Sequence, residues 1–195
     1  MRNDWVTIMK KNKRLKLTIF QTLTHYGIVL LLLFIATLTG WSLVEIYFTD
    51  TYSGVQTANE LINVSLLFLV LALIFVVIQY RRLSFKEFQM SYTDEQFQEA
   101  IERTINDLQW QVEKNNKTFF RAVRVWDWTG SLGEMVTIIK DKDRILINNI
   151  CDPDHISSVF SYGWNRKNIK TFIKHLSDIL NNRSIELKEV KEINE

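Results

Sequence analysis

The sequence predicts a membrane α-helical hairpin of two transmembrane helices, followed by a small α+β cytoplasmic domain. Two apolar runs without charge, residues 26–44 and 61–80, predict the hairpin. A helix rises about 1.5 Å per residue, so roughly 20 apolar residues cross a hydrocarbon core of about 30 Å. A later segment passes from a helical to a strand-like and back to a helical pattern. It predicts a helix, three to four antiparallel strands and a helix.

The chain divides into five expected segments. A basic cytoplasmic arm comes first, and the transmembrane hairpin follows with spans at about 26–47 and 61–80. A juxtamembrane linker then leads to the α+β domain and a charged C-terminal tail. The expected bounds are 1–25 for the arm, 26–80 for the hairpin, 81–92 for the linker, 93–182 for the domain and 183–195 for the tail.

Basic residues predict the orientation of the hairpin. Six Lys or Arg precede the first span and three follow the second, whereas the loop between them has none. Cytoplasmic flanks retain Lys and Arg, so both termini are expected in the cytoplasm and the chain in the inner (cytoplasmic) membrane as a multi-pass protein. The lipid bilayer is therefore an expected partner. The expected membrane-surface residues are Lys10, Lys11, Lys13, Arg14, Lys16, Arg81 and Arg82.

Two other interpretations of the apolar runs are disfavoured. A cleaved signal peptide would have a shorter apolar region and a small-x-small cleavage site. A buried hairpin in a soluble protein would need a larger core than the rest of this chain can build. The arm itself fits two descriptions, an amphipathic helix at the membrane surface that continues into the first span, or a plain topology signal.

The domain is expected to begin with a helix capped by Thr93, with Gln96 completing a capping box, and to end that helix at 115–116. Strands are expected at 118–128, 134–140 and 144–151. Residues 157–162 fit either a short fourth strand or an ordered loop. Asn165 is expected to cap the last helix, whose apolar stripe is Ile169, Phe172, Ile173, Leu176 and Leu180.

Charge and cysteine content exclude some classes of function. Residues 91–195 carry fifteen basic and seventeen acidic residues, and nucleic-acid modules instead have a basic face, so no nucleic-acid partner is expected. Cys151 is the only cysteine, so the chain forms no intramolecular disulfide, which suits a cytoplasmic domain.

The domain resembles the cytosolic tail of uncharacterised small bacterial two-span membrane proteins. The resemblance rests on GEMVTIIKDKDRILINNICDP followed by SYGWNRKNIKTFIKHL and covers roughly residues 93–180. It implies the boundary of the domain. It implies no activity and no catalytic residue.

Motifs for catalysis or cofactor binding are few. The sequence contains no phosphate-binding glycine loop, no Gly-x-Ser-x-Gly elbow and no CxxC pair. The segment from Cys151 to His155 fits three interpretations: a structural turn, a nucleophile–base pair of Cys151 and His155, or a cation site that includes Asp152 and Asp154. The turn is favoured, because residues so close in the sequence seldom give the geometry that a nucleophile–base pair or a cation site needs. No catalytic residue, metal or cofactor is expected.

The strongest candidate for a binding surface combines aromatic and basic residues. Tryptophan beside arginine is typical of binding hot spots. The alternative is ordinary core with a half-buried outer face. The candidate residues are Arg121, Arg124, Trp126, Trp128, Tyr162, Trp164, Asn165 and Arg166.

The sequence therefore predicts a non-enzymatic, membrane-anchored binding, assembly or regulatory module, whose partner is an unknown protein or a second copy. Two alternatives stay open. One is a small oligomeric membrane effector or channel-like subunit, and the other is a thiol enzyme that uses Cys151.

Overall fold

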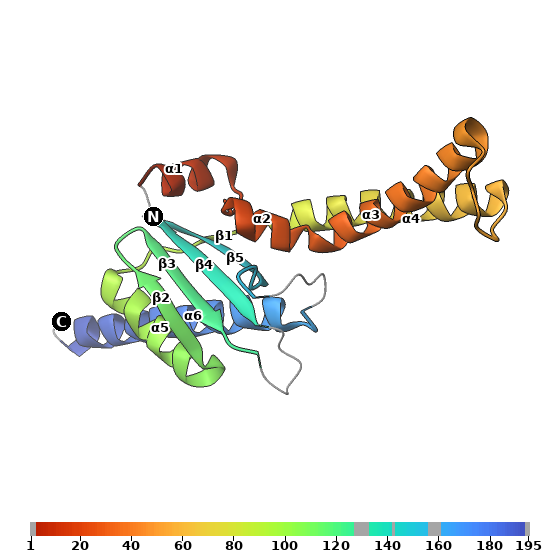
Figure 1. Ribbon diagram of the computed structural model, residues 1–195. Helices are drawn as coiled ribbons and strands as arrows, with labels where there is room; N and C mark the ends of the chain where they lie inside the picture. Colours follow the sequence, from red (N-terminus) through yellow and green to blue (C-terminus); the bar gives the residue numbers. More distant parts are fainter. Residues whose placement is uncertain (1–2, 127–132, 142, 156–160, 194–195) are drawn as a thin grey trace.

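The computed structural model describes residues 3–126, 133–141, 143–155 and 161–193 (Figure 1). Two long helices project from one end of a domain that has a sheet and two covering helices. The helical segments are α1 (Asn3–Asn12), α2 (Ile19–His25), α3 (Gly27–Val44), the π-helix η1 (Glu45–Thr49), α4 (Ala58–Arg82), α5 (Asp94–Leu108) and α6 (Trp164–Ile193). The strands are β1 (Lys86–Gln89), β2 (Trp110–Asn115), β3 (Phe119–Arg124), β4 (Glu134–Asp141) and β5 (Arg144–Cys151).

The hairpin consists of two helices that are each long and apolar enough to cross a membrane. The first extends from Gly27 to Thr49 and the second from Ala58 to Arg82. Only 17% and 11% of their most apolar 18-residue windows are buried within the chain. Thr57 and Glu60 form a capping box that begins α4 after the loop.

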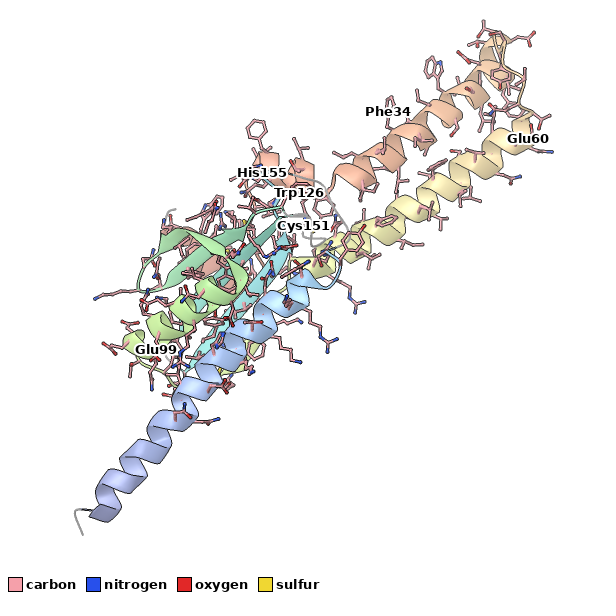
Figure 2. All side chains as sticks on the ribbon, turned by 90° about the horizontal axis from the view of Figure 1, so that it is seen from below. Phe34, Glu60, Glu99, Trp126, Cys151 and His155 are labelled. Carbon is pink, nitrogen blue, oxygen red and sulfur yellow. The ribbon has the colours of Figure 1, made fainter. Side chains whose placement is uncertain are left out.

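The two hairpin helices contact each other along one narrow seam. Val29 and Leu32 of α3 pack with Ala72 of α4 in a small buried cluster. The Ser65 hydroxyl of α4 donates to the carbonyl oxygen of Ala36, 3.3 Å away. The seam leaves the other sides of both helices exposed, as the side chain of Phe34 illustrates (Figure 2).

The sheet has five strands within the described residues, in the order β1-β5-β4-β3-β2, and all neighbours are antiparallel. Three to four strands were expected, so the α+β class is confirmed and the strand count is wrong. The segment 81–92 is not merely a linker, because β1 pairs with β5. The first domain helix ends at Leu108, where Gln109 takes a left-handed φ of 55°, and β2 follows where the sequence predicted more helix.

One face of the sheet is covered by α5 and α6, which lie side by side (Figure 1). Thr93 and Gln96 form the expected capping box at the start of α5. Phe97 of α5, Phe120 of β3 and Phe172 of α6 are fully buried and meet ring to ring. Burial of this aromatic core holds the two helices on the sheet.

The other face of the sheet is covered by the N-terminal arm, which the sequence interpretation placed at the membrane surface. Met9 of α1 is 0% exposed and packs with Phe119, Leu146 and other apolar residues. The arm also does not continue as one helix into the first span, because Lys13 takes a φ of 50° between α1 and α2. The arm is therefore part of the folded domain.

The arm and the hairpin meet where α4 reaches the sheet. The backbone amide of Leu15 donates to Leu83, and that of Phe85 donates to Lys13, at 2.8 and 2.9 Å. Gln79 donates through its side chain to the His25 carbonyl oxygen at 2.6 Å. These contacts connect the hairpin directly to the domain.

The C-terminal segment differs from the expected charged tail, because α6 continues as helix to Ile193. The helix also begins at Trp164, one residue before the expected cap at Asn165. Of the segment 157–162, expected as a fourth strand or an ordered loop, residues 157–160 lie outside the described residues, and residues 161 and 162 belong to no strand.

Candidate functional site

At one end of the sheet β3 and β5 end and β4 begins, which places Arg124, Glu134 and Cys151 in one row. The sheet register pairs Arg124 with Glu134, and Glu134 with Cys151. We call this the sheet-end row. Figure 2 shows Trp126, Cys151 and His155 at this end of the domain, near the base of α4. The row therefore lies where the hairpin, the sheet and the start of α6 converge.

Arg124 and Glu134 form a buried ion pair. Their side chains are 7% and 0% exposed, and Nη1 lies 3.9 Å from Oε2. The guanidinium carbon also lies 3.6 Å from the centre of the Trp164 ring, a cation–π distance. Arg124 therefore belongs to the interior, which is the alternative that the sequence interpretation left open for this residue.

The strand expected at 118–128 ends earlier, since β3 ends at Arg124, so Trp126 lies beyond the sheet. The strand instead separates the two arginines: Arg124 shares the α5–α6 face with Phe120, whereas Arg121 points to the arm. Trp128 lies outside the described residues.

Trp126 is 53% exposed and borders a small cavity of about 300 Å³ beside Arg124 and Asp152. Asp152 is buried and organises the turn after β5: its carboxylate accepts from the amide of Asp154 at 3.0 Å and lies 3.7 Å from His155 Nε2. Gly133 lies at the edge of the same cavity and takes a φ of 85°, which glycine adopts without strain.

The turn interpretation of residues 151–155 fits these contacts. Cys151 is buried, and its sulfur lies 3.8 Å from an Arg82 guanidinium nitrogen at the end of α4. His155 lies beside Asp152 at the other side of the turn. Among the described residues, no group of three or more His, Cys, Asp or Glu is arranged to hold a metal ion.

The start of α6 carries the remaining candidates. Tyr162 is 75% exposed with a φ of 46°, and Gly163 beside it has a φ of 86°. The carbonyl oxygen of Asn165 accepts from the Asn149 side chain at 3.3 Å, which ties α6 to β5. Arg166 is exposed one residue further on.

Several of the expected membrane-surface cations contact the protein itself. Lys10 pairs with Asp141 at 3.2 Å, and Lys13 pairs with Glu87. The Arg14 guanidinium donates to the Tyr80 carbonyl oxygen at 2.7 Å and stacks on its ring. Lys16 lies over the ring of Trp5, and Arg82 contacts Cys151. The remaining two, Lys11 and Arg81, are exposed.

Sequence reasoning missed a second cavity, of about 470 Å³, between the arm and the sheet. Gln21 and Arg121 line it together with Glu113 and Trp5. Burial lowers the pKa of the Arg121 guanidinium, with Glu113 acting in the opposite direction. Gln21 also donates to the Asp154 carboxylate at 2.9 Å, so one lining residue of this cavity is bonded to the turn after β5. No spacing in the sequence connects residue 21 with residue 154.

Comparisons with protein-family models, curated proteins and solved structures give no significant match. The resemblance to small two-span membrane proteins therefore stays a sequence-level expectation.

Proposed function

We propose that this chain is an integral inner-membrane protein whose two spans anchor a cytoplasmic, non-enzymatic binding or assembly module. The observation that carries this proposal is the exposed apolar surface of α3 and α4. Their side chains mostly face away from the rest of the chain. Soluble monomers rarely expose large contiguous apolar patches, whereas lipid tails solvate such a surface.

The orientation follows from the distribution of charge. The cations of the arm and of the end of α4 lie at the domain end of the hairpin, and residues 45–60 contain no Lys or Arg. We therefore place both termini and the domain in the cytoplasm, with the loop at 50–57 on the far side.

The proposed contact surface is an aromatic rim, defined as Trp126 and Tyr162. Both side chains are more than half exposed, whereas Phe97, Trp110 and Phe172 of the same domain are buried. Trp126 borders the cavity beside Arg124, and Tyr162 directly precedes the start of α6. Exposed aromatic side chains are enriched at protein-binding hot spots. The partner is a protein, either a second copy of this chain or another cytoplasmic or membrane protein.

A photo-crosslinking amino acid at position 126, in the full chain in its native membrane, tests the binding role. We expect a discrete protein adduct at position 126 and none at position 112, since Val112 is similarly exposed on β2 but lies outside the rim. A tagged second copy of the chain distinguishes self-association from another partner. Equal adducts at both positions, or none at either, would contradict a specific rim.

Two alternative functions predict other results. A channel-like subunit must oligomerise, because two spans cannot enclose a pore, and it would conduct ions in a planar bilayer. A thiol enzyme would need an accessible Cys151, whose side chain is only 4% exposed. We therefore expect slow reaction of Cys151 with a small thiol reagent in the folded protein.

A further inference from the structure

We propose that the junction of α4, β5 and α6 binds the headgroup of an anionic phospholipid. This inference rests on the proposed membrane anchoring and names a ligand for a different part of the domain from the aromatic rim. A cavity of about 440 Å³ at this junction carries the inference.

The cavity has a strongly positive wall. Arg81 and Arg82 come from the end of α4, Lys86 from β1 and Arg166 from the first turn of α6. Among the described residues, no carboxylate lines it. Four cations around one hollow repel each other, so a phosphate group placed among them would be stabilised. The N-terminal end of α6, also part of the lining, adds a partial positive charge.

Two asparagine side chains of β5 hold the walls of the cavity in place. Asn148 and Asn149 are among the lining residues and are only 2% and 7% exposed. The Asn148 amide nitrogen donates to the carbonyl oxygens of Arg82 and Ser84, and the Asn149 amide nitrogen donates to that of Asn165. These bonds attach the end of α4 and the start of α6 to β5, so the fold sets the positions from which the cations project.

The position of the cavity selects a lipid over a soluble phosphate. Arg81 and Arg82 are the last residues of the second candidate span, where lipid headgroups begin. Ile78 and Ile169 supply an apolar wall on the same lining, which suits the glycerol and upper acyl region of a lipid.

The test uses the full-length chain, released from membranes in mild detergent and analysed by native mass spectrometry with defined lipids. The probes are phosphatidylglycerol, whose headgroup carries a net negative charge, and phosphatidylcholine, whose headgroup is zwitterionic. We expect preferential retention of phosphatidylglycerol. Equal retention of the two lipids would overturn the anionic-headgroup site.

Variants locate the site. Lys86→Gln and Arg166→Gln, both at exposed side chains, are each expected to weaken retention of phosphatidylglycerol about fivefold. Lys170→Gln, one turn along α6 and outside the lining, is the matched control and should leave retention unchanged. Equal effects of all three variants would show attraction by general charge and would overturn the site.

Soluble glycerol phosphate separates the two sources of phosphate. We expect it not to displace phosphatidylglycerol, and displacement at comparable concentration would overturn the lipid assignment. Recovery of the chain outside the membrane fraction would instead contradict the proposed function. A chain that inserts into membranes but does not select phosphatidylglycerol would overturn this inference alone.

Discussion

Glu134→Gln is expected to destabilise the domain strongly, because it removes the charge that faces Arg124 while preserving the shape of the side chain. The two charged groups lie 3.9 Å apart and both are buried. At an effective dielectric constant of about 20, their attraction is about 4 kcal/mol. Removing one partner of a buried pair typically costs about 3–5 kcal/mol, so the two approaches agree.

A loss of about 3 kcal/mol should lower the Tm of a domain of roughly 100 residues by about 12–24 °C. Thermal unfolding of the full chain in detergent, followed by tryptophan fluorescence, measures this shift, and Trp164 provides a probe beside Arg124.

Glu99→Gln is the matched control. Its pair with Arg103 is closer, at 2.6 Å, but both side chains are nearly half exposed. An exposed helix pair contributes about 0.3–0.5 kcal/mol, so Tm should change by no more than about 4 °C. Equal shifts for Glu134→Gln and Glu99→Gln would refute the argument that burial sets the strength of the pair.

Replacing both members of the buried pair gives a further check. A double variant with Leu at 124 and 134 is expected to be more stable than Glu134→Gln, because it leaves no buried charge without its partner. If the double variant is less stable than the single one, Arg124 contributes mainly through its stacking on Trp164.

Three further predictions concern other parts of the domain. Met9→Asp should abolish the cooperative melt of the domain, since it places a charge in the core between arm and sheet; an unchanged melt would show that the arm is dispensable. Gly133→Ala should cost about 1–2 kcal/mol in denaturant unfolding because its φ of 85° disfavours a side chain, and a neutral result would contradict that geometry. Burial raises the pKa of Tyr92 to about 12, so the folded state favours the protonated phenol. The contribution of Tyr92 to the free energy of unfolding is present below pH 10 and declines as pH rises from about 10 to 12. Tyr92→Phe should remove that decline, and the same pH dependence of stability in the variant would contradict the raised pKa of Tyr92.

The hairpin and the α+β class could be predicted from the sequence because their patterns are local. Two uncharged apolar runs of sufficient length need no tertiary information, and Thr93 with Gln96 marks the start of α5 by itself. The end of that helix could not be predicted. Gln109 takes a left-handed conformation that glycine usually provides, so nothing marks the change to β2.

The role of the arm was missed because one pattern fits two environments. Apolar residues at helical spacing among lysines, such as Met9, predict a face that avoids water, and either lipid or a sheet can cover it. The sheet covers it here. Likewise β1 has only four residues, and its strand character comes from pairing with β5 rather than from its own composition.

The candidate site shows the same limit. The sequence singled out arginine beside tryptophan, but strand alternation and the end of β3 decided that Arg124 turns inward and that Trp126 stays exposed. The partner of Arg124 lies across the sheet at Glu134, a register that no single sequence reveals. Arg81, Lys86 and Arg166 line one cavity only in the folded chain, and no spacing in the sequence brings them together.

Accessibility of introduced cysteines in intact cells tests the central claim most directly. In a Cys151→Ser background, Ser53→Cys places a thiol in the loop between α3 and α4, and Lys117→Cys places one between β2 and β3; both native side chains are exposed. We predict that a membrane-impermeant thiol reagent labels position 53 in intact cells and labels position 117 only after the cells are opened. Labelling of position 117 but not of position 53 in intact cells would reverse the orientation. Labelling of neither position in intact cells, with the chain recovered in the soluble fraction, would contradict membrane anchoring.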